Sequence, residues 1–190
     1  DGAPAVFAGI NPENGKFFVG TKGVFNKNPK VNYTNADIDA NHSSPGLNSK
    51  LKDALKHLPK LGIKDVLQGD MLFTKDDLST ETIDGKSYLT FQPNTIVYAV
   101  PKESSNKIKK AKMGIVWHTT YSGEKLEDMR ATFGANISGL KKTDDVYFTD
   151  ADYRDTSGTV NFNKAETASI TKVLSSAGKK FRELKSSFMN

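Results

Sequence analysis

The sequence predicts an α+β fold in which largely antiparallel sheet is flanked by a few helices. Short apolar segments with strand-like composition are joined mostly by turns, for example at residues 11–15 and 84–85. Only two longer segments, residues 47–61 and 164–188, repeat apolar residues at helical spacing. The 190 residues suffice for one domain of ordinary size, so we expect a single domain over residues 1–190.

The composition fits a soluble globular protein, with 36% hydrophobic and 26% charged residues. No apolar run approaches the roughly 20 residues of a membrane span, so we expect no membrane partner. The absence of cysteine excludes disulfides and thiol nucleophiles and suits a cytosolic protein. The net charge of +5 favours an anionic partner, usually nucleic acid, although many basic domains are simply soluble.

The first third of the chain predicts a hairpin, a loop and a helix. Residues 4–10 and 16–20 are strand-like segments on either side of the turn NPENG. Residues 26–46 are rich in Asn, Asp, Ser and Pro and predict a surface loop. Leucines at helical spacing predict a helix over residues 47–61, which Pro59 should end or kink.

The middle of the chain predicts four strands and a short helix. Residues 63–73 and 113–121 are apolar strands, and residues 88–101 predict two further strands. Residues 123–134 predict a short amphipathic helix, and turn signals with short strands follow.

A C-terminal helix is predicted over residues 164–188 of the segment 164–190. Asn163 and Glu166 have the spacing of a capping box at its start. Its apolar stripe contains Ile170, Val173, Leu174, Ala177, Phe181, Leu184 and Phe188. This helix either caps the sheet or docks on another protein.

Common metal and phosphate motifs are absent from the sequence. His42, His57 and His118 lie far apart, and none stands in an H-x-x-x-H or H-x-E arrangement. No G-x-x-x-x-G-K-[ST] loop, G-x-G-x-x-G turn or G-x-S-x-G elbow occurs.

Asp70 is an acid in the middle of the apolar strand VLQGDMLF. By strand alternation it shares a face with Val66, Gln68 and Leu72. A carboxylate there must be paired, bound to metal or placed at an open cleft. The alternative is an ordinary solvent-facing sheet position.

Five patterns occur in a characteristic order: DG at 1–2, GTK at 20–22, QGDM at 68–71, IVYAV at 96–100 and KMGIVWH at 112–118. This order resembles the motifs of the covalent nucleotidyltransferases, the superfamily of ATP-dependent DNA and RNA ligases and mRNA capping enzymes. The opening DGAPAVFAG…FFVGTK is similar in particular to ligase-like proteins of tailed bacteriophages.

The resemblance implies a ligase adenylation domain without an OB domain, acting with ATP and Mg²⁺ on nicked or broken DNA or RNA. In such proteins a lysine attacks the α-phosphorus of ATP, and the resulting lysyl-AMP passes AMP to a 5′-phosphate. A 3′-hydroxyl then displaces AMP. The resemblance also implies the cytoplasm of an infected bacterial host, or association with the virion.

The resemblance assigns nucleotide binding to Asp1, Gly2, Lys22, Phe91, Tyr98, Gly114 and His118. Asp1 and Gly2 would form the turn after the nucleophile, and Lys22 would lie near the ribose and phosphates. Tyr98 would stack on adenine, with Phe91 competing for that role. Asp70 stands where the family has a metal-related glutamate and would hold Mg²⁺.

The chain also departs from the family pattern. The nucleophilic lysine is expected two residues before Asp1, so we expect an N-terminal truncation and no catalytic residue in this chain. Met113 stands in place of a second metal-binding glutamate, and His118 in place of a lysine. Lys141-Lys142 is a poor substitute for the final K-x-K strand.

These departures favour an alternative, a non-catalytic ligase-like phage module with a structural or nucleic-acid-binding role. A plain α+β domain with chance matches is a third possibility.

Residues 102–112 carry five lysines against one glutamate. This segment predicts nucleic-acid contacts by Lys107, Lys109, Lys110 and Lys112, made to the phosphate backbone without sequence preference. The alternative is a solvated charged turn.

Overall fold

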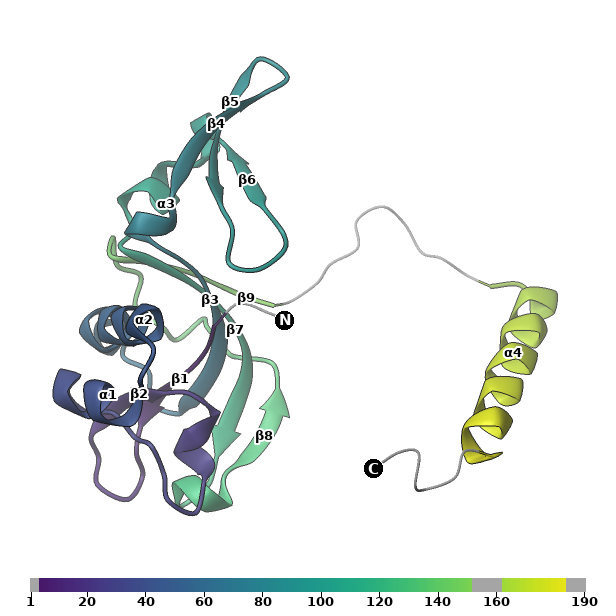
Figure 1. Cartoon of the computed structure of the whole chain (residues 1–190), viewed down its shortest axis with the longest axis horizontal. Coiled ribbons are helices and arrows are strands. Elements are labelled where there is room, and N and C mark those ends of the chain that lie inside the picture. Colours follow the sequence, from purple (N-terminus) through teal and green to yellow (C-terminus); the bar gives the residue numbers. More distant parts are fainter. Residues whose placement is uncertain (1–3, 152–161, 184–190) are drawn as a thin grey trace. The chain divides into compact units, whose positions relative to one another are not determined.

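The computed structural model describes residues 4–151 and 162–183 and confirms the α+β class (Figure 1). The chain divides into two compact units, residues 1–152 and 153–190. Within the described residues, the first unit contains all the strands, and the second contains the helix α4 (Lys164–Glu183).

The larger sheet has the strand order β2-β1-β3-β7-β8, with β9 also paired to β7. Its strands are β1 (Ala5–Ile10), β2 (Phe17–Gly20), β3 (Val66–Thr74), β7 (Met113–Ser122), β8 (Arg130–Phe133) and β9 (Val146–Asp150). All neighbours pair antiparallel except β9, which runs parallel to β7. The predicted opening hairpin is confirmed as the pair β1–β2.

The smaller sheet has the order β4-β5-β6, with β4 (Ser79–Ile83), β5 (Lys86–Phe91) and β6 (Tyr98–Pro101). Its inner side packs on the end of β3, where Phe73, Leu89 and Phe91 share a cluster with Ile108. The predicted turn at residues 84–85 joins β4 to β5, and both of its residues have positive φ. Strand β4 itself was missed, because four of its five residues are polar and all five are exposed.

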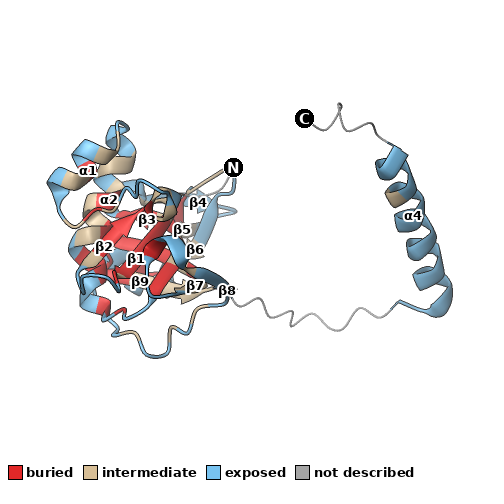
Figure 2. Ribbon diagram, turned by 90° about the horizontal axis from the view of Figure 1, so that it is seen from below, coloured by how far each residue is buried: buried red, intermediate tan, exposed pale blue. Residues whose placement is uncertain are grey.

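Helices α1 (Asn35–Asn41) and α2 (Pro45–His57) cover one face of the larger sheet (Figures 1 and 2). Leu51 and Ala54 of α2 pack against Met71, Ile115 and Trp117 of the sheet, all of them buried. After His57 the chain continues as the 3-10 turn η2 (Leu58–Leu61), which contains Pro59. Pro59 thus marks the end of the α-helix, as predicted.

The loop predicted over residues 26–46 is partly wrong, because this segment contains α1 and the start of α2. A capping box begins α1: the Thr34 hydroxyl accepts a bond from the Asp37 amide, and the Asp37 carboxylate accepts one from the Thr34 amide. The signal T-x-x-D was present in the sequence. A high content of Asn and Asp obscured it.

The helix predicted over residues 123–134 is wrong. The segment forms a short 3-10 turn η5 (Leu126–Asp128) followed by strand β8, which pairs with the end of β7. Of the expected apolar face, Leu126 is buried but Phe133 is 83% exposed. The free edge of β7 offers ladder hydrogen bonds that a short isolated helix cannot match.

The C-terminal helix is confirmed for α4, residues 164–183, while residues 184–190 lie outside the described part. Its capping box is present, since Asn163 Oδ1 accepts from the Glu166 amide and Glu166 Oε2 from the Asn163 amide. The apolar stripe of α4 is exposed, with no buried residue. No described helix is long and apolar enough to cross a membrane.

Candidate functional site

Asp70 and His118 lie on the face of the larger sheet opposite α2. Their strand neighbours Met71 and Trp117 point into the core beneath α2, so alternation directs Asp70 and His118 to the other side. The register shifts between Gln68 and Gly69, which leaves His118 without a partner across the β3–β7 ladder.

The Nε2 atom of His118 lies 3.8 Å from Oδ1 of Asp70, and both side chains keep contact with solvent, at 22% and 39% exposure. The Nδ1 atom of His118 lies 2.8 Å from the Thr119 hydroxyl, which orients the ring. A carboxylate and an imidazole at an open position can hold a cation, transfer a proton or contact a phosphate.

Asp70 could hold Mg²⁺ only together with oxygens from a ligand. Among the residues that the structure describes, no group of three His, Cys, Asp or Glu side chains gathers as a metal site. Mg²⁺ is commonly held by one or two carboxylates plus substrate phosphates and water. A metal at Asp70 would therefore need further oxygen ligands from outside the described side chains.

The N-terminal segment enters the sheet beside this pair. Ala5 pairs with Asp70 across the β1–β3 ladder, and the Pro4 carbonyl accepts a 3.0 Å bond from the Met71 amide. The predicted site residues Asp1 and Gly2 lie outside the described residues. Pro4, the first described residue, thus lies opposite Met71, one ladder position from Asp70.

An aromatic cluster covers the neighbouring end of the same face. Tyr121 donates a 2.8 Å hydrogen bond to Oε1 of Gln68, and burial raises the pKa of Tyr121. The Tyr121 ring stacks on Phe25 at 4.7 Å. Phe25 ends the 3-10 turn η1 (Lys22–Phe25), so the predicted residue Lys22 belongs to an element that packs on this face.

Gly114 has a packing role. The ring of Phe73 lies where a side chain would be, because a Cβ on Gly114 would meet Phe73 Cε1 at 2.2 Å. This close approach explains the glycine without a ligand.

The two aromatic candidates Phe91 and Tyr98 stack on each other in the smaller sheet, with ring centroids 5.3 Å apart and planes 4° apart. Phe91 also packs on Phe73 and is only 5% exposed, whereas Tyr98 is 38% exposed. Of the two, Tyr98 is the side chain that a ligand could reach.

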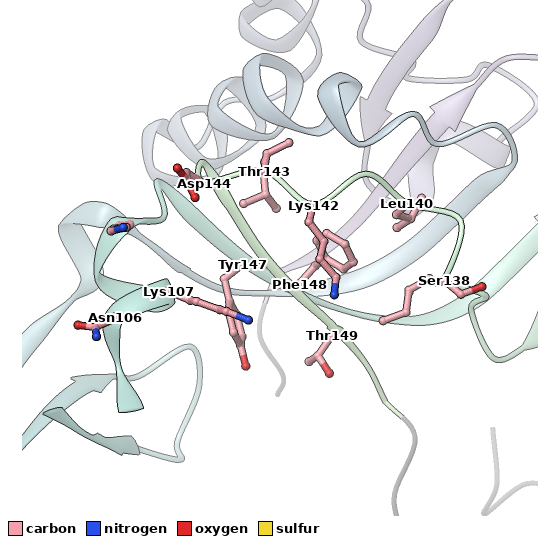
Figure 3. Close-up of a pocket in the computed structure, with 13 residues that line it drawn as sticks. Asn106, Lys107, Ser138, Leu140, Lys142, Thr143, Asp144, Tyr147, Phe148 and Thr149 are labelled. Atoms are coloured by element: carbon pink, nitrogen blue, oxygen red, sulfur yellow. The ribbon is translucent and has the colours of Figure 1, made fainter. Parts of the chain in front are cut away.

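A basic groove of about 960 Å³ lies along β9, between the helix α3 (Asn106–Lys110) and the loop 137–144. Lys107 and Lys110 line it from α3, and Lys142 lines it from the loop. In the view of Figure 3, the Lys107 side chain crosses Tyr147 and the Lys142 side chain lies over Phe148. The groove does not include Asp70 or His118.

The groove separates the four lysines predicted to contact nucleic acid. Lys107 and Lys110 line it, whereas Lys109 and Lys112 do not. Sequence reasoning missed Lys142, Tyr147 and Thr149, which join the groove from a distant part of the chain. The sequence predicted only turns and short strands in this stretch, and it did not predict the parallel pairing of β9 with β7.

Met113 faces away from Asp70. It is fully buried in the core beneath α2, in the same cluster as Ile115 and Trp117. A side chain at this position therefore does not reach the open face of the sheet.

One family model matches the chain over residues 1–190, and it is described as a family of unknown function (DUF6267). No curated protein and no solved structure matches the chain significantly.

Proposed function

Because the chain belongs to this family of unknown function, we propose its activity from its own residues: it is the adenylation domain of an ATP-dependent polynucleotide ligase-like protein. One observation carries the proposal. Three segments resemble the first, third and fifth motifs of the covalent nucleotidyltransferases. They lead into or lie on β1, β3 and β7, three adjacent strands of one sheet. Segments that build one nucleotide site must be neighbours in the fold, and these segments are.

In the proposed reaction, a lysine two residues before Asp1 attacks the α-phosphorus of ATP. The new nitrogen–phosphorus bond forms as the bond from the α-phosphorus to the bridging oxygen breaks, and pyrophosphate leaves with the electron pair. The amine must lose a proton. His118, on the same face of the sheet as Asp70, would accept this proton as a general base. Asp70 would hold Mg²⁺, which neutralises charge on the phosphates when bound.

A second candidate function is a non-catalytic ligase-like module that keeps the fold and binds nucleic acid. The burial of Met113 favours it, since a second metal-binding carboxylate is absent from that position and the position itself points into the core. The two candidates differ in covalent chemistry and are separated by one assay.

The assay uses a protein that carries the proposed lysine two residues before Asp1. The protein is incubated with ATP labelled at the α-phosphate and with Mg²⁺, and then separated under denaturing conditions. We expect a labelled protein band that does not form when EDTA is present from the start. Added pyrophosphate with Mg²⁺ should remove the label from the protein. A folded protein with that lysine present and no labelled band would support the non-catalytic module instead.

A further inference from the structure

We propose that the groove along β9 binds the phosphodiester backbone of a single-stranded nucleic acid. This inference rests on the proposed function, because it names the surface that would bind the nucleic-acid substrate of the ligase-like protein. It is also narrower than the sequence prediction, which treated the lysines of residues 102–112 as one group.

Charge is the first argument. Three lysines, Lys107, Lys110 and Lys142, line the groove against a single carboxylate, Asp144. In residues 4–151 and 162–183, no acidic side chain forms an ion pair with any of these lysines. Lysines gathered from two segments distant in sequence provide the electrostatic attraction that dominates backbone binding.

The remaining lining groups suit the same ligand. Asn106, Ser138 and Thr149 provide amide and hydroxyl groups, which commonly contact phosphate and sugar. Tyr147 adds a half-buried ring that stacks on Phe73 with centroids 6.3 Å apart. Grooves for single strands combine positive charge with such aromatic side chains.

The size and position of the groove fit a chain rather than one ion. Its volume of about 960 Å³ lies near the top of the roughly 300–1,000 Å³ range of small-molecule sites. Among the described strands, β9 pairs only with β7, and four consecutive residues of β9, Val146–Thr149, line the groove, which therefore follows this strand. An extended strand can therefore follow it.

The chain contains a close control for each lysine. Lys109 lies on α3 between Lys107 and Lys110 but is outside the groove. Lys141 directly precedes Lys142, but its amide donates to the Leu61 carbonyl and its side chain lies beside Gly62. All of these lysine side chains are exposed, so replacing them should leave the fold intact.

The test measures fluorescence anisotropy of a labelled single-stranded oligonucleotide with the whole chain. We expect Lys107→Ala/Lys142→Ala to weaken binding at least about tenfold and to make the slope of log affinity against log salt shallower by about 1.4. The control Lys109→Ala/Lys141→Ala removes the same charge and should stay within about twofold of wild type. Equal loss in both pairs, or loss in neither, would overturn the proposal.

Two further measurements distinguish this proposal from its alternatives. Lys107→Gln/Lys142→Gln keeps the aliphatic stems and should reproduce the loss, while far-UV circular dichroism confirms the fold. ATP affinity should not change in either pair; a loss of ATP affinity parallel to that of the oligonucleotide would assign the groove to the triphosphate and overturn the proposal. The protein could form no AMP adduct while Lys107→Ala/Lys142→Ala still weakens oligonucleotide binding and Lys109→Ala/Lys141→Ala does not. That result would contradict the proposed enzymatic function and support the nucleic-acid groove.

Discussion

The imidazole of His118 and the carboxylate of Asp70 lie 3.8 Å apart on the open face of the larger sheet. The two residues are 48 positions apart in sequence, and a register shift in the β3–β7 ladder brings them together. Both point away from the core that α2 covers. Strand β1, which follows the N-terminal Asp-Gly, enters the sheet beside this pair.

We predict that Asp70→Asn lowers Mg²⁺-dependent adduct formation by at least about 100-fold, because the amide cannot provide the negative charge that holds the metal. The rate of label incorporation, measured over a Mg²⁺ titration in the complete gene product, checks this. Asp76→Asn removes an exposed carboxylate in the 3-10 turn Lys75–Asp77 that follows the same strand, and it should leave the rate unchanged. Full activity in Asp70→Asn would remove Asp70 from the metal site.

Gly114→Ala should destabilise the fold, by about 1–3 kcal/mol, because the new methyl group overlaps the Phe73 ring in a buried position. Urea unfolding followed by circular dichroism measures the loss. Gly46→Ala is the control, since a Cβ there meets nothing within 4 Å. An unchanged urea midpoint for Gly114→Ala would show that Phe73 repacks freely.

Asp145 gives a pH-dependent contribution to stability. The Lys60 ammonium, 2.6 Å away, holds the pKa of this carboxyl below its usual value, and His57 adds to the effect. A lowered folded-state pKa means that the stabilisation is present above the unfolded pKa of about 3.9 and is lost as pH falls through the folded value. Asp145→Asn should therefore destabilise the protein more at pH 6 than at pH 2.5.

The measurement is the urea midpoint of wild type and Asp145→Asn at both pH values. The neighbouring Asp144 forms no ion pair within the described residues, so Asp144→Asn should leave both midpoints near wild type. An equal loss at pH 6 and pH 2.5 would show that Asp145→Asn acts through packing rather than charge.

Tyr98 and Phe91 should separate into a binding role and a structural role. Tyr98→Leu is expected to weaken ATP binding by about fivefold or more, in line with about 1–3 kcal/mol for a base stacked on an aromatic ring. Phe91→Leu should instead lower the free energy of unfolding, because Phe91 is buried between Phe73 and Tyr98. Calorimetric ATP titration and urea unfolding of both variants check this; unchanged ATP affinity in Tyr98→Leu would contradict it.

Local patterns predicted much of the fold. The opening hairpin, the helix that Pro59 ends and the capped C-terminal helix each depend on short-range signals that the structure confirms. The errors arose where tertiary context decides. Residues 130–133 form a strand only because the end of β7 offers them an edge, and β4 is a polar strand that only its pairing with β5 identifies.

The candidate site was predicted less completely. Mid-strand Asp70 was recognisable, because an acid in an apolar strand requires an explanation. Its proximity to His118 was not predicted, because it depends on the pairing of β3 with β7 and on the register shift in that ladder. The groove was not predictable. Lys107 and Lys142 are 35 positions apart, and only the parallel placement of β9 on β7 brings the loop 137–144 near α3.

The most direct test of the central claim is peptide mass spectrometry of the complete gene product after incubation with ATP and Mg²⁺. The account predicts AMP attached through a phosphoramidate to the lysine two residues before Asp1, in the segment that leads into β1 beside Asp70. A folded protein that carries no AMP, or that carries it on a lysine remote from β1, β3 and β7, would contradict the account.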